Sequence, residues 1–146
     1  MRVVAVTEDQ GKIVETEWLK RAEGVHRQLR PQLPADYVSR LKEIFAAGGR
    51  MALSVEDEDV VSVALWRLVD NTYEGRRLYV DDLVTDADRR SRGVGHFLLA
   101  WLEEKARNLG CGVLALDSGV QRQEAHRFYF REGMAISSYC FRKVLK

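Results

Sequence analysis

The stretch RRSRGVGHFLLAWLEEKA (residues 89–106) decides the fold of this chain. It starts with arginines and two closely spaced glycines, and it runs directly into a segment whose apolar residues recur at helical spacing. The strand-like segment LYVDDLVT (residues 78–85) comes just before it. N–H groups at a helix start lack intrahelical partners and the helix dipole favours anions, so a strand, a basic glycine loop and a helix start together bind phosphate. We therefore predict an anionic ligand that bears a pyrophosphate.

Composition limits the chain to an ordinary globular protein. Its 146 residues suffice for a single domain, residues 1–146, and its hydrophobic content of 46% allows a proper core. Lys and Arg number 23 against 22 Asp and Glu, a net charge of +1, which argues against a general nucleic-acid binder. No apolar run reaches membrane-spanning length, and the first apolar stretch is too short for a secretory signal. The expected location is the cytoplasm.

Periodicity along the chain predicts a mixed α/β fold with the order β-α-α-β-β-β-α-β-α-β. The predicted strands are residues 2–6, 51–55, 60–69, 77–85, 113–116 and 135–144, and the predicted helices are residues 18–29, 37–45, 93–109 and 123–132. We expect a central mixed sheet of about six strands with helices on both faces. The two cysteines, Cys111 and Cys140, fall in or beside predicted strands and are expected to be reduced and buried.

Two motifs give the chain a resemblance to a known family. The first is Arg90-Ser91-Arg92-Gly93-Val94-Gly95, an arginine followed by two spaced glycines. The second is Ala125-His126-Arg127-Phe128-Tyr129, followed by Gly133 and Met134. Together, and at this separation, they resemble the GNAT superfamily of acyl-CoA-dependent N-acetyltransferases, in its bacterial form. One departure is Arg122, where many relatives carry asparagine.

The resemblance implies acetyl-CoA as a co-substrate and a site for it. The pyrophosphate would lie on the loop and helix start, and the pantetheine arm would pair with the backbone of the preceding strand, which the family usually breaks with a bulge. The expected cofactor-binding residues are Leu83, Val84, Thr85, Arg90, Ser91, Arg92, Gly93, Val94, Gly95 and His96. The alternative is that the glycine pair is a plain helix-entry loop and that the strand residues serve the core.

The chemistry needs a proton donor for the leaving thiolate, and a proton must leave the amine. The resemblance assigns the donor to Tyr129, because a phenol with a pKa of about 10 can protonate a thiolate whose acid has a pKa of about 8.5; otherwise Tyr129 packs beside Phe128. Asp81 and Asp82 are the candidate bases. Alternation along a strand points them to opposite faces, so that one faces the acceptor. Asp117, at a strand end, is a third option. No His/Cys/Asp cluster has metal-ligand spacing, so we expect no metal.

We therefore expect an enzyme that transfers the acetyl group of acetyl-CoA to a primary amine by direct attack in a ternary complex. The acceptor remains open: a polyamine-like or amino-sugar metabolite, a protein N-terminus or a lysine. Five aromatic residues are candidates for its cleft, the alternative for each being that it packs in the core: Trp18, His26, Tyr37, Trp66 and Tyr73. The alternative function is a non-catalytic acyl-CoA-binding sensor or regulatory module. Neither nucleic acid nor membrane is an expected partner. The last predicted strand could pair across a homodimer.

Overall fold

A five-stranded sheet forms the frame of the protein, with its strands in the order β1-β2-β3-β4-β5. The computed structural model describes all 146 residues, which divide into two compact units, Met1–Ala115 and Leu116–Lys146. The strands are β1 (Arg2–Ala5), β2 (Arg50–Glu56), β3 (Asp59–Asn71), β4 (Gly75–Thr85) and β5 (Val113–Leu116). Neighbours from β1 to β4 pair antiparallel. The mixed α/β fold predicted from the sequence is confirmed, with five strands in place of about six.

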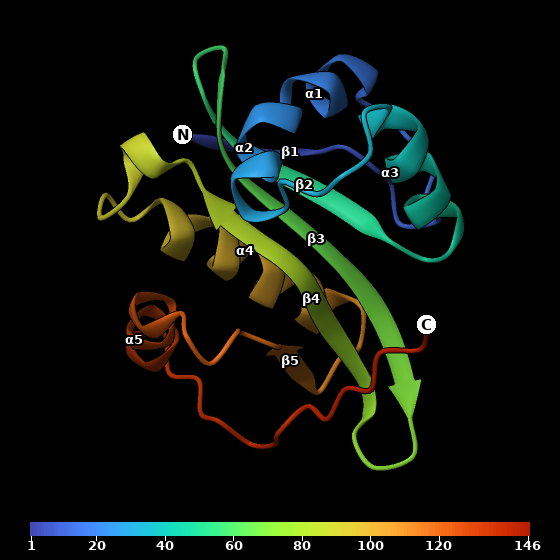
Figure 1. Ribbon diagram of the computed structural model, residues 1–146, viewed down its shortest axis with the longest axis vertical. Coiled ribbons are helices and arrows are strands. Elements are labelled where there is room, and N and C mark those ends of the chain that lie inside the picture. The colour runs from blue at the N-terminus through green and yellow to red at the C-terminus, as the bar shows by residue number, and fades with distance from the viewer. The chain divides into compact units, whose positions relative to one another are not determined.

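Helices cover both faces of the sheet in the first unit (Figure 1). They are α1 (Thr16–Arg21), α2 (Glu23–Leu29), α3 (Tyr37–Ala46) and α4 (Val94–Asn108), with a short 3-10 turn, η1 (Ala87–Arg89), between β4 and α4. The first three lie over one face, and α4 crosses the other. The first predicted helix is interrupted at Ala22, whose N–H is shared between the carbonyls of Trp18 and Leu19. None of the helices combines the length and the apolar character that crossing a bilayer requires.

Each face of the sheet has its own apolar layer. Under α1, α2 and α3 the fully buried members of one continuous core include Leu19, Leu41 and Leu53. On the other face, Trp66 of β3 meets Trp101 of α4 edge to face, with ring centroids 5.6 Å apart. Burial of these two layers supplies the main free energy that holds the sheet between its helices.

A bulge interrupts β4 between Val80, which faces the apolar layer under α4, and Val84, which faces the layer under α1–α3. Leu65 pairs with Asp82 but the next residue of β3, Trp66, pairs with Val80, so Asp81 is an extra residue in β4. Side chains alternate along a regular strand, and an extra residue shifts that alternation by one. Accordingly Val80 pairs with the tryptophan that faces α4, whereas Val84, four residues later, belongs to the core under α1–α3. The bulge that the family resemblance implies is present.

The second unit contains one helix, α5 (Gln123–Arg131), which ends before Gly133 at a φ of 83°. The strand predicted over residues 135–144 is not formed, and that part of the prediction was wrong: residues 134–146 have no regular secondary structure. The expectation that Cys140 is buried was also wrong, because Cys140 is exposed. An alternating apolar pattern indicates strand propensity, but a strand forms only where its backbone finds a partner.

Candidate functional site

The β4 bulge places both aspartates of the strand on the face covered by α2. Asp82 accepts a hydrogen bond from Arg30 and contacts His26, both from the α2 region. Asp81 is held by Arg67, which follows the α4-facing Trp66 and therefore points to the α2 side. The prediction that Asp81 and Asp82 point to opposite faces was wrong, because simple alternation does not hold across a bulge.

A buried chain of polar groups runs from α3 to β4. The hydroxyl of Tyr37 lies 2.8 Å from Nδ1 of His26, and Nε2 of the same ring lies 2.7 Å from Oδ2 of Asp82. An ionised carboxylate only accepts hydrogen bonds, so Nε2 carries a proton and donates a hydrogen bond to Asp82. The Tyr37 hydroxyl donates to Nδ1 when the ring is neutral and accepts from Nδ1 when the ring is protonated. The tyrosine, the histidine and the carboxylate are all buried, so each of these bonds satisfies groups that water cannot reach.

Opposing effects act on the ionisation of this chain. Burial raises the pKa of Asp82, but the hydrogen bond and charge of His26 and the charge of Arg30 outweigh burial, so this pKa lies below its ordinary value of 3.8. Burial, together with the negative charges of Glu23 and Asp82, raises the pKa of Tyr37 well above 10. At neutral pH the chain therefore has a charged end at β4 and a neutral phenol at α3.

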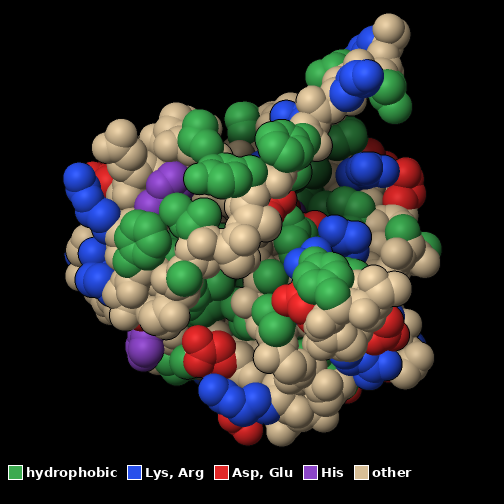
Figure 2. All heavy atoms as spheres, turned by 90° about the horizontal axis from the view of Figure 1, so that it is seen from below, with side chains coloured by type: hydrophobic (Ala, Val, Ile, Leu, Met, Phe, Trp, Pro, Cys, Tyr) green, Lys and Arg blue, Asp and Glu red, His purple; other side chains and the backbone are tan.

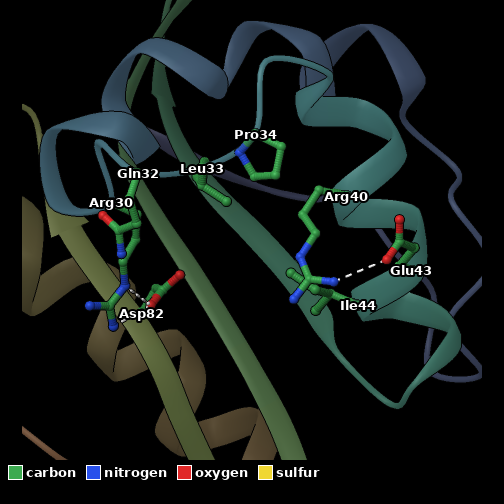
Figure 3. Close-up of a pocket in the computed structure, with 8 residues that line it drawn as sticks. All are labelled: Arg30, Gln32, Leu33, Pro34, Arg40, Glu43, Ile44 and Asp82. Carbon is green, nitrogen blue, oxygen red and sulfur yellow. Dashed lines mark hydrogen bonds and ion pairs between the residues drawn. The ribbon is translucent and has the colours of Figure 1, made fainter. Parts of the chain in front are cut away.

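Asp82 opens onto a cavity of about 620 Å³ between the end of α2, the loop after it and α3. Figure 3 shows Arg30 beside Asp82 at one end and the Arg40–Glu43 pair of α3 at the other, with Leu33 and Pro34 between them. The Arg30 guanidinium lies 2.7 Å from Oδ1 of Asp82 and also donates to the backbone carbonyl of Asp81. The cavity thus combines an apolar wall with two guanidinium–carboxylate pairs.

Asp81 has different surroundings from Asp82. Its two carboxylate oxygens are bound bidentately by Arg67, at 2.7 and 2.9 Å, and it does not line the cavity. Arg67 also stacks over the ring of Tyr79, 5.4 Å from its centroid. These contacts fix the side chain of Asp81 at the bulge of β4.

The loop between β4 and α4 is anchored at its start. Arg89 forms ion pairs with Glu56 and Asp59 at the tip of the β2–β3 hairpin, at 3.4 and 3.1 Å. Gln28 of α2 accepts a hydrogen bond from the backbone of Ala87. Arg89 therefore serves the loop itself, and no local sequence pattern distinguishes it from Arg90 and Arg92.

The start of α4 offers unused donors. The first hydrogen bond of the helix joins the N–H of Phe97 to the carbonyl of Gly93, so the N–H groups of Val94 and Gly95 precede the helical ladder. No side chain caps this end. Gly93 has a φ of 77°, a left-handed conformation that turns the loop into the helix, and Ser91 shares it at 65°.

Positive charge accompanies this helix start. Arg90 and Arg92 are exposed, and neither forms an ion pair. His96 is exposed in the first turn, whereas the side chain of Val94 is buried. The arginine charges add to the positive end of the helix dipole at residues 90–96, and such a field favours anions.

The last residues of β4, just before this helix start, pair with a neighbouring strand on one side and not on the other. Leu83, Val84 and Thr85 pair with Ala64, Val63 and Ser62 of β3. On the other side β5 begins next to Arg76, where the N–H of Gly112 donates to the Arg76 carbonyl at 3.0 Å. Four residues of strand extend about 13 Å and Leu83 lies seven residues beyond Arg76, about 23 Å away, so β5 does not reach it. This strand edge is open to an extended ligand.

Tyr129 lies in α5, within the second unit. It packs edge to face against Phe128, with centroids 5.4 Å apart. Burial raises the pKa of the Tyr129 hydroxyl, and the positive charge of Arg122 opposes this, so the phenol stays protonated at neutral pH. Arg122 is the N-cap residue of α5 and makes no side-chain cap bond. The asparagine of many relatives would be a good N-cap, which gives that departure a physical meaning.

The five predicted cleft aromatics do not line the cavity. His26 and Tyr37 form the buried chain, and Trp66 faces α4. The guanidinium groups of Arg2 and Arg21 both lie over the ring of Trp18, and Tyr73 is exposed in the β3–β4 turn. No group of three His, Cys, Asp or Glu side chains is arranged to hold a metal ion.

Figure 2 shows lysine and arginine side chains scattered among acidic and hydrophobic ones on the face it presents.

Sequence reasoning missed Arg30 and Arg67. A signal for Arg30 was present: His26 and Arg30 are four residues apart, so they share one side of a helix that includes both. No comparable signal existed for Arg67, because its pairing with Asp81 depends on the bulge.

The fold is α/β, and an uncapped, basic helix start follows a strand whose last residues pair with β3. Comparisons with known proteins identify the class. The sequence model of the Acetyltransferase (GNAT) family matches residues 13–134. An N-acetyltransferase of Bacillus subtilis, YhdJ, described as uncharacterized, is 36% identical over 121 residues, which cover 80% of this chain and 84% of that protein.

Two further relatives are more distant or shorter in overlap. The aminoalkylphosphonate N-acetyltransferase of Salmonella typhimurium is 41% identical over 66 residues, 45% of this chain and 43% of that protein. Among solved structures, AAC(6')-Iy in complex with a CoA bisubstrate analogue superposes with a TM-score of 0.82 at 16% identity, over 99% of this chain and 97% of that one. The chain belongs to the acetyltransferase (GNAT) family and is an N-acetyltransferase.

Proposed function

We propose that this protein transfers the acetyl group of acetyl-CoA to a primary amine by direct attack in a ternary complex. The observation that carries the proposal is the uncapped start of α4, with the unpaired Arg90 and Arg92, next to the open edge of β4. These features match two adjoining parts of CoA: the pyrophosphate needs N–H donors and positive charge, and the pantetheine amides need a strand edge.

The proposed roles follow from these contacts. The pyrophosphate lies on residues 90–96, and the pantetheine arm pairs with the backbone of Leu83, Val84 and Thr85. The amine nitrogen bonds to the thioester carbonyl carbon, the carbon–sulfur bond breaks, the amine loses one proton and the CoA thiolate gains one. We assign the proton of the thiol to Tyr129, following the family motif.

The acceptor is proposed to occupy the cavity beside Asp82. Oδ1 of Asp82 is held by Arg30 and Oδ2 by one bond from His26, so one lone pair of Oδ2 remains for the ammonium or for a water that carries its proton away. The low pKa of Asp82 suits it to attract and orient the amine more than to retain the proton. Asp81, held by Arg67, is proposed to keep the bulge in place.

The first experiment is calorimetric titration with acetyl-CoA, with free CoA alongside. Micromolar binding followed by thiol release in the presence of a panel of primary amines supports the proposal. Binding without thiol release for any amine, including peptides, would favour an acyl-CoA sensor. The absence of binding to any acyl-CoA would refute the proposal.

A further inference from the structure

The acceptor cavity has more unused hydrogen-bond donors than unused acceptors. Arg30 uses Nε and Nη2 for Asp82 and for the Asp81 carbonyl, and Nη1 has no partner. Arg40 uses Nη1 for Glu43 at 3.0 Å, and its Nε and Nη2 have no partner. Each guanidinium is fully charged at neutral pH, so the free N–H groups are strong donors.

The carboxylates of the cavity are already engaged. The Asp82 side chain is 9% exposed and both of its oxygens have partners, while Glu43 is 67% exposed and uses only Oε2 for Arg40. A ligand therefore meets arginine N–H groups more readily than carboxylate oxygens. The chemical group that fits such donors is an oxyanion.

We infer that the acceptor is an amine that also carries an acidic group, and that Arg30 binds this group. The inference rests on the proposed function, because it places the acceptor in this cavity. The acidic group accepts from Nη1 of Arg30, the amine lies near the free lone pair of Asp82, and Arg40 adds positive charge at the far end. A polyamine would instead bring a second cation to a cavity in which each carboxylate already has an arginine partner, so that cation gains less than an acidic group does.

Arg30 is suited to this role because it is held in place before any ligand arrives. Asp82 fixes it at Nε and Nη2, and the buried Tyr37–His26 pair in turn fixes Asp82. A long side chain normally loses rotamer freedom when it binds a ligand, but that cost is already met in the fold. Tyr37 and His26 are thus positioning residues for the acceptor site.

The test compares acceptors that differ only in the acidic group. The matched pairs are β-alanine with β-alaninamide, and 4-aminobutyrate with 4-aminobutanamide. For each compound kcat/KM is measured with saturating acetyl-CoA and calculated on the concentration of the unprotonated amine. 1,4-Diaminobutane is the dicationic comparison. We expect the acid of at least one pair to exceed its amide by about tenfold or more, because hydrogen bonds to charged groups have this magnitude. Equal values for acid and amide in both pairs would overturn the inference.

Variants connect the preference to one residue. Arg30→Gln should lower the acid-to-amide ratio about tenfold, whereas Arg21→Gln, on an arginine outside the cavity, should leave the ratio unchanged. Arg30→Lys keeps a positive charge beside Asp82 and is therefore less disruptive to folding. It loses the planar guanidinium, so it should give an intermediate acid-to-amide ratio. An unchanged ratio in a folded Arg30→Gln protein would also overturn the inference.

The outcomes separate this inference from the proposed function. Acetylation of the amides or of 1,4-diaminobutane in preference to the acids would overturn the acidic acceptor and leave the acetyltransferase proposal standing. Turnover of no amine in the panel despite tight acetyl-CoA binding would likewise refute the acidic acceptor. Failure to bind acetyl-CoA would refute the proposed function itself.

Discussion

Replacement of Tyr37 by phenylalanine tests the buried polar chain directly. The substitution removes one oxygen and keeps the ring, so the contact of the ring with Arg27, 6.0 Å from its centroid, is retained. It leaves Nδ1 of His26 without a hydrogen-bond partner in a site that water does not reach, because His26 is 1% exposed. A buried polar group left unsatisfied costs about 1–3 kcal/mol.

Urea unfolding measures this cost. With a slope of about 2 kcal/mol per molar urea, typical for a small domain, a loss of about 2 kcal/mol lowers the midpoint by about 1 M. The matched control is Tyr73→Phe, at a tyrosine that is 73% exposed, where the change should stay within about 0.5 kcal/mol. Combination with His26→Leu should give less than the sum of the two single effects, because the two residues share a bond.

The reasoning would be refuted by a Tyr37→Phe protein as stable as the control, with an unchanged slope. That result would mean that the hydroxyl does not bond to His26 in solution. Full additivity with His26→Leu would lead to the same conclusion by a second route.

Three other predictions concern Asp82, Gly93 and Tyr129. Folding lowers the pKa of Asp82, so its ionisation stabilises the protein above the unfolded-state pKa, and this stability is lost as pH falls through the folded-state pKa. Urea unfolding from pH 7 to pH 2 should therefore show a stability difference between wild type and Asp82→Asn that shrinks below about pH 4. A difference that stays constant over this range would contradict the prediction. Gly93→Val places a β-branched residue at a φ of 77° and should weaken acetyl-CoA binding, measured by calorimetry, at least about tenfold. The control Gly110→Val has the same φ beyond the other end of α4 and should weaken binding far less. Equal losses of affinity would mean that the effect is only general strain. Tyr129→Phe should lower kcat by about a hundredfold with an unchanged Kd for acetyl-CoA, compared with Tyr139→Phe at an exposed tyrosine, and unchanged turnover would remove Tyr129 from the mechanism.

Sequence periodicity predicted most of the first unit because each element there has a local signal. The helix after Gly93 was predicted to within two residues, since its apolar stripe and its glycine start lie within one short segment. The strand at residues 113–116 was found with its observed bounds from four consecutive apolar residues. Such signals need no knowledge of distant contacts.

The parts that failed depend on partners far along the chain. The facing of Asp81 and Asp82 depends on a bulge, which arises from the register between β3 and β4 and not from the residues beside it. The bond between Tyr37 and Asp82 through His26 joins three separate elements, so no local pattern reports it. The strand predicted at residues 135–144 failed for the related reason that its pattern contains no information about a partner.

The extra residue at Asp81 also restricts how the length of β4 can change. Residues before it supply the layer under α4 and residues after it supply the layer under α1–α3, so the strand meets two separate spacing requirements. Deletion of Asp81 would leave Val80 and Val84 three residues apart, so regular alternation would keep each in its own layer, and the strand would lose the bulge together with the Arg67 contact. An added residue between Val80 and Val84 has no such solution, because it would turn Val84 out of its layer if the bulge is kept and would shift the pairing of Leu83–Thr85 with β3 if the bulge is lost.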